Sequence, residues 1–437
     1  MPRRLDSTRS DFEQAFSDLL GEKREADEDV GKVVGDILAA VRKDGDAAVL
    51  QFTERFDRVR LTADEMRVPA ADIAAAHDAC AADVLAALAK AHDRISEFHR
   101  RQIPEDIDYV DASGVRLGGR WRPVAAAGLY VPGGTAAYPS SVLMNAVPAQ
   151  VAGVERIVMV VPAPDGVLNP LVLAADDLAG VSEIYRIGGA QAVGALAYGT
   201  ETIAPVDKIV GPGNAYVAAA KRQVFGAVGI DMIAGPSEIL VVADGSNDPA
   251  WIAADLLSQA EHDRAAQSLL ITDDAAFADA VEAAVESHLS TLPRADIARE
   301  SWDQYGAIIL VPDIAAALPL IDRIAPEHLE LACNGAEALA DKVRNAGAIF
   351  IGAYTPEVIG DYVAGPNHVL PTGRTSRFSS GLSVLDFLKR SSLISCSAEG
   401  LRAIGPAAVT LANAEGLQAH ALSVAIRLND GAPDDDT

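Results

Sequence analysis

Residues 156–245 alternate between short apolar runs and alanine-rich stretches, and this rhythm constrains the fold more than any other feature of the sequence. The run at 157–161 is continuously apolar, as expected of a strand buried on both faces. Further strands are predicted at 184–187 and 208–210, with a helix-like stretch at 168–178. Strands that alternate with helices in this way indicate a parallel α/β sheet.

A second α/β set follows in the sequence. Its predicted strands are 239–242, 268–271, 307–311 and 348–351, and its predicted helices are 249–261, 275–288 and 327–345. The two sets could be distant copies of one unit, although no short-period repeat connects them. Residues 31–103 show helical periodicity, residues 120–134 indicate a strand and a Pro-Gly loop, and the chain beyond residue 379 is predicted to be helical again.

Length and charge narrow the class of protein. A chain of 437 residues exceeds one ordinary hydrophobic core, so two or more domains are expected. The net charge of −26 argues against a nucleic-acid partner and against an anionic membrane surface. The three cysteines are far apart and predict reduced thiols in a cytoplasmic protein. No secretory signal and no apolar run of the ~18 residues needed for a membrane span is found.

Four segments in the second half of the chain combine histidine with a carboxylate or an amide. They are residues 259–262, 326–330, 360–368 and 415–420, and they contain four of the eight histidines. Imidazole with carboxylate and carbonyl oxygen is the ligand set of a borderline divalent metal such as zinc. Histidine beside glutamate is also suited to proton transfer near neutral pH. The sequence therefore predicts a metal-assisted enzyme.

Two of these segments fall on predicted helices. Gln259 and His262 are three residues apart, so they share one helix face, and a solvated face is the alternative. Pro326 and Glu327 are typical of a helix start, where the positive end of the helix dipole would keep His328 uncharged. The alternative is an ordinary first-turn glutamate beside an incidental histidine.

The other two segments are less regular. Asp361 is predicted in a tight loop after the strand at 348–351, where α/β proteins place their sites, although a turn-forming aspartate is the alternative. Glu415 and His420 are five residues apart, roughly 140° around a regular helix. Both side chains can contact one ligand only if the ligand lies across the helix or if the helix is irregular. The alternative is that one side chain is buried and the other lies in solvent.

Glycines mark two loops that could bind phosphate. Residues 188–194 follow a predicted strand and open a helix, a context in which backbone N–H groups hold phosphate. Residues 211–214 are similar. Neither loop is a complete dinucleotide fingerprint, so nucleotide binding is only one of the alternatives that these loops allow.

Taken together and in order, these segments resemble the histidinol dehydrogenase family. The resemblance covers Val30 to Leu428, and its most specific stretches are 129–134, 188–192, 210–217 and 234–238 together with the four histidine segments. It implies NAD-dependent oxidation of L-histidinol to L-histidine through the aldehyde, with one zinc ion per subunit. The alternative is a zinc- and NAD-dependent dehydrogenase of another small hydroxylated substrate; a small-molecule-binding protein without catalysis is a third reading.

The resemblance also assigns residues. The implied zinc ligands are Gln259, His262, Asp361 and His420, and the implied catalytic pair is Glu327 and His328. Substrate contacts are implied for Ser237, His368 and Glu415, with His328 and several zinc ligands also lying against the substrate. Cofactor contacts are implied for Tyr130, Gln191 and Asn214. In this scheme His328 removes the hydroxyl proton, Glu327 activates the water that hydrates the aldehyde, and zinc orients the substrate.

For the fold, the resemblance implies two Rossmann-like parallel-sheet domains and a homodimer with intertwined terminal segments. The expected division is a helical arm at 1–30, a first α/β domain at 31–129 with 238–380, an NAD-binding domain at 130–237, and a C-terminal helical segment at 381–437. That last segment would carry Glu415 and His420 into the active site of the partner subunit.

Overall fold

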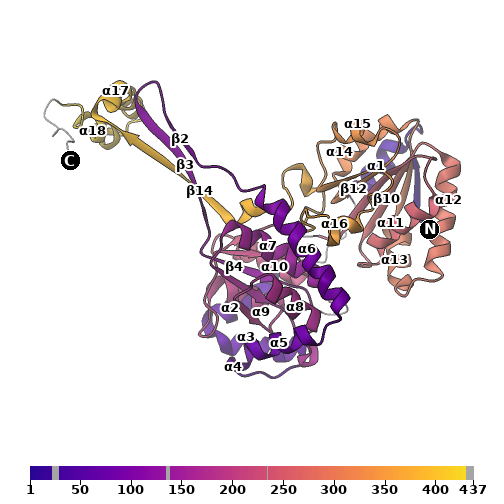
Figure 1. Cartoon of the computed structure of the whole chain (residues 1–437). Helices are drawn as coiled ribbons and strands as arrows, with labels where there is room; N and C mark the ends of the chain where they lie inside the picture. Colours follow the sequence, from indigo (N-terminus) through magenta and orange to yellow (C-terminus); the bar gives the residue numbers. More distant parts are fainter. Residues whose placement is uncertain (22–28, 134–137, 234, 430–437) are drawn as a thin grey trace. The chain divides into compact units, whose positions relative to one another are not determined.

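The structure is a computed structural model of the whole chain, and it describes all residues except 22–28, 134–137, 234 and 430–437. It divides into two compact units, each assembled from two stretches of sequence (Figure 1). The first unit comprises Met1–Gln102 and Val124–Phe387, and the second comprises Ile103–Pro123 and Leu388–Thr437. Among the described residues, no helix combines the length and apolar character needed to cross a lipid bilayer.

The first unit contains a five-stranded parallel sheet in the order β6-β5-β4-β7-β8. Its strands are β4 (Ala126–Tyr130), β5 (Arg156–Val160), β6 (Glu183–Tyr185), β7 (Lys208–Val210) and β8 (Gly229–Ile230). The predictions for β5, β6 and β7 are confirmed. The strand order reverses direction between β4 and β7, and a doubly wound sheet forms its ligand crevice at such a point.

Helices cover both faces of this sheet, because alternate residues of each strand point to opposite sides. Ile157 and Met159 of β5 pack with one set of helices and Val158 and Val160 with the other. The first set is α5 (Ala70–Asp78), α6 (Ala82–Arg100), α7 (Pro139–Ala152) and α8 (Pro170–Leu178); the second is α2 (Asp29–Asp44), α3 (Asp46–Asp57), α9 (Gly189–Tyr198) and α10 (Ala215–Val224). The short helix α4 (Ala63–Met66) completes the N-terminal region.

This packing differs from the expected grouping of residues 31–129 with residues 238–380. The helices of residues 31–100 bury their apolar faces on the five-stranded sheet, as Val34, Ile37 and Leu38 show by packing with its strands. Helical periodicity reveals that a face is buried, but it does not reveal which sheet buries it.

A second, six-stranded parallel sheet lies in the same unit, in the order β1-β11-β10-β9-β12-β13. Its strands are β1 (Arg3–Asp6), β9 (Glu238–Ala243), β10 (Gln267–Thr272), β11 (Ala307–Leu310), β12 (His328–Ala332) and β13 (Ala348–Ile351). Its helices are α1 (Phe12–Gly21), α11 (Pro249–Ala260), α12 (Ala275–Leu289), α13 (Ala295–Tyr305), α14 (Leu318–Ile324), α15 (Ala336–Ala340) and α16 (Val358–Tyr362). Short 3₁₀ turns lie at Pro164–Gly166, Ile314–Ala317, Thr375–Arg377 and Val384–Phe387.

Two expectations for this region are wrong. Residues 327–345 are not one helix, because they form strand β12 and the short helix α15. Residues 1–30 do not form a purely helical arm: β1 pairs with β11 at the sheet edge, and Phe12 and Phe16 of α1 enter the core beneath the sheet. The predicted strands at 239–242, 268–271, 307–311 and 348–351 are confirmed.

The two sheets share one topology. When the strands β4 to β8 and the strands β9 to β13 are each numbered one to five along the chain, both sheets have the spatial order 3-2-1-4-5. The larger sheet has β1 as an additional edge strand. The shared strand order supports the interpretation that the two α/β sets are distant copies of one unit.

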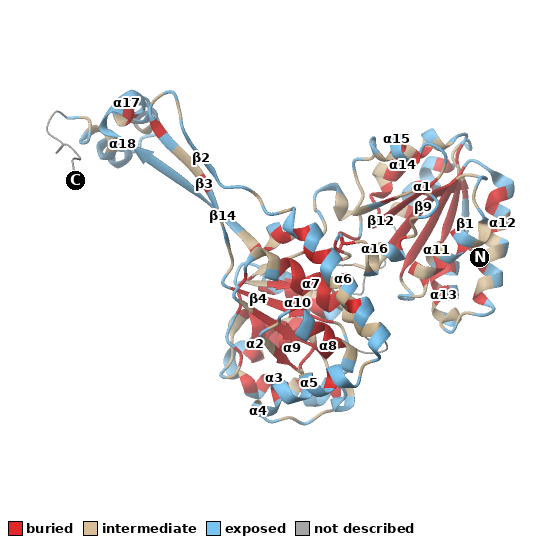
Figure 2. Ribbon diagram, in the orientation of Figure 1, coloured by how far each residue is buried: buried red, intermediate tan, exposed pale blue. Residues whose placement is uncertain are grey.

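The second unit consists of a three-stranded antiparallel sheet and two helices (Figure 1). They are β2 (Ile107–Val110), β3 (Val115–Pro123), β14 (Leu388–Cys396), α17 (Ala398–Ala414) and α18 (Gln418–Ala425). Strand β14 was not predicted, because the chain beyond residue 379 was expected to be helical. The unit buries little: β2 is exposed throughout, and β14 is exposed beyond its first residue (Figure 2).

Candidate functional site

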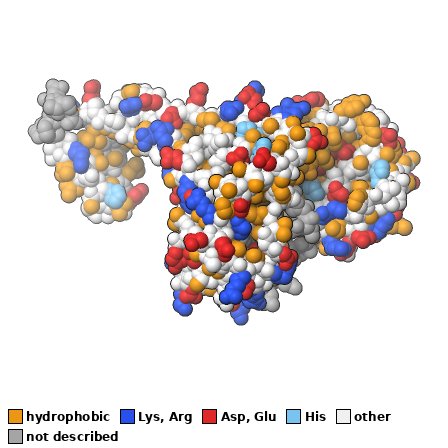
Figure 3. All heavy atoms as spheres, turned by 60° about the horizontal axis from the view of Figure 1, so that its bottom comes forward, with side chains coloured by type: hydrophobic (Ala, Val, Ile, Leu, Met, Phe, Trp, Pro, Cys, Tyr) orange, Lys and Arg blue, Asp and Glu red, His pale blue; other side chains and the backbone are white. Residues whose placement is uncertain are grey.

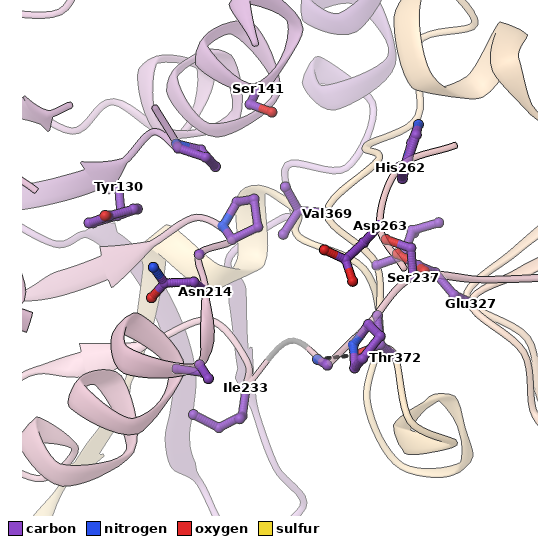
Figure 4. Close-up of a pocket in the computed structure, with 18 of the residues that line it drawn as sticks. Tyr130, Ser141, Asn214, Ile233, Ser237, His262, Asp263, Glu327, Val369 and Thr372 are labelled. Carbon is purple, nitrogen blue, oxygen red and sulfur yellow. Dashed lines mark hydrogen bonds between the residues drawn. The ribbon is translucent and has the colours of Figure 1, made fainter. Parts of the chain in front are cut away.

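A cavity of about 980 Å³ in the first unit is lined by residues from both of its sheets. From the five-stranded sheet come Tyr130 and Asn214, which lie at the carboxyl ends of β4 and β7 (Figure 4). From the six-stranded sheet come Ser237, His262 and Glu327 (Figure 4). These last residues precede β9, β10 and β12, so the larger sheet contributes the amino ends of these strands to the cavity.

His328 is the first residue of β12 and is buried. Its Nδ1 lies 2.9 Å from the carbonyl oxygen of Glu238, which can only accept, so Nδ1 carries the proton and Nε2 keeps its lone pair. Burial lowers the pKa of His328, which keeps the imidazole neutral. The His328 imidazole is therefore neutral, as expected, but for a different reason. No helix begins at this residue, and the cause is desolvation, not a helix dipole.

Glu327 precedes this strand and is also buried. Its Oε2 accepts a hydrogen bond of 2.8 Å from the backbone N–H of Glu238 and lies 3.8 Å from His328 Nδ1. Burial raises the pKa of Glu327 well above its ordinary value, and the N–H bond offsets this only in part. The carboxyl can therefore hold or release a proton inside the cavity.

Asp361 approaches His328 from the short helix α16, and not from a tight loop as predicted. Its Oδ1 lies 3.9 Å from His328 Nε2 and 3.9 Å from His368 Nδ1. His368 also places Nδ1 3.0 Å from the carbonyl oxygen of Asp361 and Nε2 3.4 Å from Ser141 Oγ. Burial lowers the pKa of His368, so a second neutral imidazole faces the same carboxylate.

Glu357 joins this group, although no sequence pattern singled out this residue. Its Oε1 lies 3.7 Å from His328 Nε2, and its Oε2 accepts a bond of 3.2 Å from Ser258 Oγ. Burial, with the neighbouring Asp361, raises the pKa of Glu357 to about 9. Ligand atoms of His328, Glu357 and Asp361 all lie within 4.8 Å of one another, close enough to hold a metal ion.

Gln259 and His262 lie next to each other, as their spacing predicted. Gln259 is in the last turn of α11 and fully buried, and its Nε2 lies 3.4 Å from His262 Nδ1. The Oε1 atom of Gln259 is buried with no hydrogen-bond partner among the described residues, and the same holds for His328 Nε2 and Glu357 Oε1. Unsatisfied buried acceptors of nitrogen and oxygen type fit a borderline cation such as zinc.

Glu415 and His420 belong to the second unit and are exposed. Neither is among the described residues that line the cavity. Helix α17 ends at Ala414 and α18 begins at Gln418, with Gly416 between them in a left-handed conformation (φ 74°). The two residues therefore do not lie on one regular helix, which is one of the arrangements that their spacing left open.

Tyr130 and Asn214 line the cavity on the side of the five-stranded sheet. The Tyr130 hydroxyl accepts a bond of 2.9 Å from the N–H of Gly189, at the start of α9, and burial raises the pKa of Tyr130 to about 12. Gln191, in the first turn of α9, is buried and is not among the described residues that line the cavity; both of its amide atoms lack a hydrogen-bond partner among the described residues. Asn214 caps α10 by accepting from the N–H groups of Tyr216 and Val217.

A buried ion pair fixes the loop that leads to Asn214. Lys221 Nζ pairs with Asp231, and both side chains are almost completely buried. Lys221 also donates to the carbonyl oxygen of Gly211 at 2.8 Å, and Asp231 accepts from the Gly211 N–H at 2.8 Å. Gly211 has φ 113°, and a Cβ there would lie 2.1 Å from the carbonyl oxygen of Tyr130. This pair therefore holds both polar backbone groups of one glycine.

Comparison with known proteins identifies this arrangement. Residues 21–428 match the family described as histidinol dehydrogenase. The histidinol dehydrogenase of Rhodospirillum rubrum is 66% identical over 99% of this chain and 100% of its own length, and that of Brucella abortus strain 2308 is 65% identical over 97% and 99%. The crystal structure of histidinol dehydrogenase from Elizabethkingia anophelis superposes with a TM-score of 0.93 at 36% identity, covering 98% of both chains. The chain belongs to the histidinol dehydrogenase family.

Proposed function

We propose that this protein oxidises L-histidinol to L-histidine through the aldehyde, the last step of histidine biosynthesis, with NAD and zinc. The observation that carries the proposal is a neutral, buried imidazole with a free Nε2 lone pair, beside a carboxyl of raised pKa, in a cavity that also contains metal-ligand residues. Family membership at 66% identity over nearly the whole chain supports the choice of substrate.

The residues fit both required groups. Zinc would be held by Gln259, His262 and Asp361, with His420 as the fourth ligand, and when bound it supplies a charged anchor that orients the substrate. NAD would be held by Tyr130, Gln191 and Asn214, and when bound it accepts hydride from the substrate carbon. The unpaired amide of Gln191 and the glycine-lined ends of β4 and β7 support this second assignment.

The protein's own side chains move the protons. His328 Nε2 takes the proton of the substrate hydroxyl, and the Nδ1–H bond to Glu238 keeps the ring in the orientation and tautomer needed. Glu327 then removes a proton from the water that adds to the aldehyde. Ser237 and His368 line the same cavity and would contact the substrate. Glu415 would add a carboxylate, which suits a cationic substrate.

We also infer a homodimer in which the partner subunit supplies Glu415 and His420. The second unit exposes apolar side chains to solvent (Figure 3). Such exposure is unfavourable for an isolated chain and is expected of a surface that binds another protein. The exposed apolar residues of this unit include Ile107, Tyr109, Val110, Leu393, Ile394, Leu411, Leu422 and Ile426. A cytoplasmic location belongs to the same proposal, since Cys80, Cys333 and Cys396 are free thiols.

The decisive experiment supplies purified protein with L-histidinol and NAD. The expected result is two NADH per histidinol and the appearance of L-histidine. His328→Asn should lower kcat by roughly 10²–10⁴-fold while histidinol still binds, because only the base is removed. No turnover of histidinol by the wild-type protein, with turnover of another small alcohol, would establish the alternative dehydrogenase instead.

A further inference from the structure

One residue outside the cavity lining holds both side chains of the catalytic pair. Glu238, the first residue of β9, is buried and is not among the described residues that line the cavity. Its backbone N–H donates to Glu327 Oε2 at 2.8 Å, and its backbone carbonyl oxygen lies 2.9 Å from His328 Nδ1. The two peptide groups on either side of a single Cα atom therefore bond to both catalytic side chains.

The position of Glu238 at the start of its strand explains these contacts. The pairing of β9 with β12 begins one residue further along, between Ile239 and His328. The N–H of Glu238 is bonded by the side chain of Glu327, which precedes β12. Any displacement of the Glu238 backbone would therefore move both members of the catalytic pair together.

The side chain of Glu238 anchors this backbone to a distant turn. Its Oε1 accepts a hydrogen bond of 3.2 Å from the N–H of Gly373. The neighbouring Thr372 Oγ1 accepts one of 2.6 Å from the N–H of Gly235 (Figure 4). The turn at residues 372–373 thus bonds to both ends of the segment 235–238, which also carries Ser237 into the cavity.

We propose that Glu238 is a positioning residue for the oxidation: its side chain fixes the start of β9 against the turn at residues 372–373, and its backbone orients Glu327 and His328. This inference rests on the proposed function and adds to it a residue that acts only through the catalytic pair. Because a misplacement of about 1 Å can slow a reaction by roughly 10²-fold, the length of the Glu238 side chain should matter more than its charge.

Two substitutions separate length from charge. Glu238→Gln keeps the length and the acceptor oxygen but removes the charge, and it should retain kcat to within roughly twofold. Glu238→Asp keeps the charge but is one methylene shorter. It should lower kcat by roughly 10–100-fold, with the KM values for histidinol and NAD nearly unchanged, because the catalytic pair is displaced while the binding residues stay in place.

Gln267→Asn is the matched control. Gln267 begins the neighbouring strand β10, pairs with Glu238 in the sheet and is similarly buried. This substitution removes one methylene at an equivalent place, but Gln267 makes its side-chain bond to the carbonyl oxygen of Tyr305, away from the catalytic pair. Gln267→Asn should therefore have the kcat of the wild type.

Proton NMR of the histidine rings gives a measurement that does not depend on turnover. The hydrogen bond to Glu238 shields the Nδ1 proton of His328 from exchange with water, and its signal is assigned by its absence in His328→Asn. The signal should persist in Glu238→Gln and be lost in Glu238→Asp.

The outcomes distinguish this inference from the proposed function. Loss of kcat in Glu238→Gln with an active Glu238→Asp would assign Glu238 an electrostatic role and overturn the positioning role. Full activity of Glu238→Asp, or an equal loss in both variants, would overturn it as well. A wild-type protein that does not oxidise histidinol, but shows the expected pattern of the His328 signal, would overturn the proposed function and leave the positioning of His328 standing.

Discussion

At the scale of single residues, burial sets the chemistry of the site. His328 and Glu327 are neighbours in sequence, and desolvation moves their pKa values in opposite directions, down for the imidazole and up for the carboxyl. Both groups are therefore neutral over a wider pH range than in water. The neutral imidazole can accept the hydroxyl proton of the substrate, and Glu327 can accept a proton from water only in its ionised form.

Two sets of residues compete for the metal, and they share Asp361. One is the family set with Gln259 and His262; the other is the cluster of Asp361 with His328 and Glu357. We expect Gln259→Ala to lose zinc on dialysis and His328→Asn to retain it, because His328 is required as a free base. Metal content per chain, measured by mass spectrometry of dialysed protein, checks this. Zinc lost from His328→Asn and kept by Gln259→Ala would place the ion in the second cluster.

Asp176 is a buried carboxyl that the mechanism does not use. It lies in the core face of α8 with Oδ1 unpaired among the described residues, and burial raises its pKa from 3.8 to about 8. The folded protein thus keeps a proton that the unfolded chain releases, so the stability this carboxyl contributes is full below about pH 4 and is lost as the pH rises towards 8. Asp176→Asn should raise stability at pH 8 by on the order of a few kcal/mol and change little at pH 4.

Urea unfolding at the two pH values measures this difference. Asp177→Asn is the matched control, since its side chain is exposed on the same helix. An equal effect of Asp176→Asn at both pH values would show that the aspartate is ionised in the folded protein throughout.

At the scale of elements, a buried ion pair holds the backbone of the loop that leads from β7 to Asn214. The Lys221–Asp231 pair holds Gly211 through both of its backbone groups, and Gly211 leads directly to Asn214. Lys221→Met should destabilise the fold by about 3–5 kcal/mol, because Asp231 would remain buried and unpaired. It should also weaken NAD binding more than histidinol binding, since the displaced loop lies at the cofactor end.

Calorimetric binding of each ligand and urea unfolding provide the two measurements. Removing both charges in Lys221→Met with Asp231→Leu should recover stability relative to Lys221→Met alone, but not the NAD affinity. Lys208→Met is the control, because Lys208 pairs with Asp386 at 3.7 Å outside the cavity lining. Equal loss of affinity for both ligands would assign the pair a purely structural role.

The type of an element, helix or strand, could be predicted where a segment showed a single residue pattern. The continuously apolar strands β5 and β9 and the alanine-rich helix α10 were found from sequence. Strand β12 was not predicted, because Pro326 and Glu327 also fit the start of a helix. Only its pairing with β9 and β13 makes this segment a strand. Strand β14 was missed for the same reason: its partner β3 lies more than 260 residues earlier.

At the scale of the whole molecule, the second unit has too small a core to stand alone. Of its strands, β2 is fully exposed, and few residues of α17 and α18 are buried. Three antiparallel strands need a covered apolar face for stability. A partner subunit that covers this unit would at the same time bring Glu415 and His420 to a second site.

A mixing experiment tests shared active sites. Chains carrying His328→Asn and chains carrying His420→Asn should each be nearly inactive alone. Co-expressed, they should recover about a quarter of wild-type activity, since half of randomly formed dimers are hybrids and each hybrid has one intact site. Sites built within single chains would show no recovery, and a monomer by light scattering would refute the dimer itself.

Periodicity and side-chain chemistry are local properties, so the two α/β sets, most of their strands and the residue types of a metal-dependent dehydrogenase could be predicted from the sequence. Tertiary structure alone decided that the helices of residues 31–100 cover the five-stranded sheet, that the larger sheet offers the amino ends of its strands, and that Glu357 joins Asp361 and His328. These features arise from contacts between segments far apart in the chain, and burial at those contacts, not sequence position, sets the protonation of His328 and Glu327.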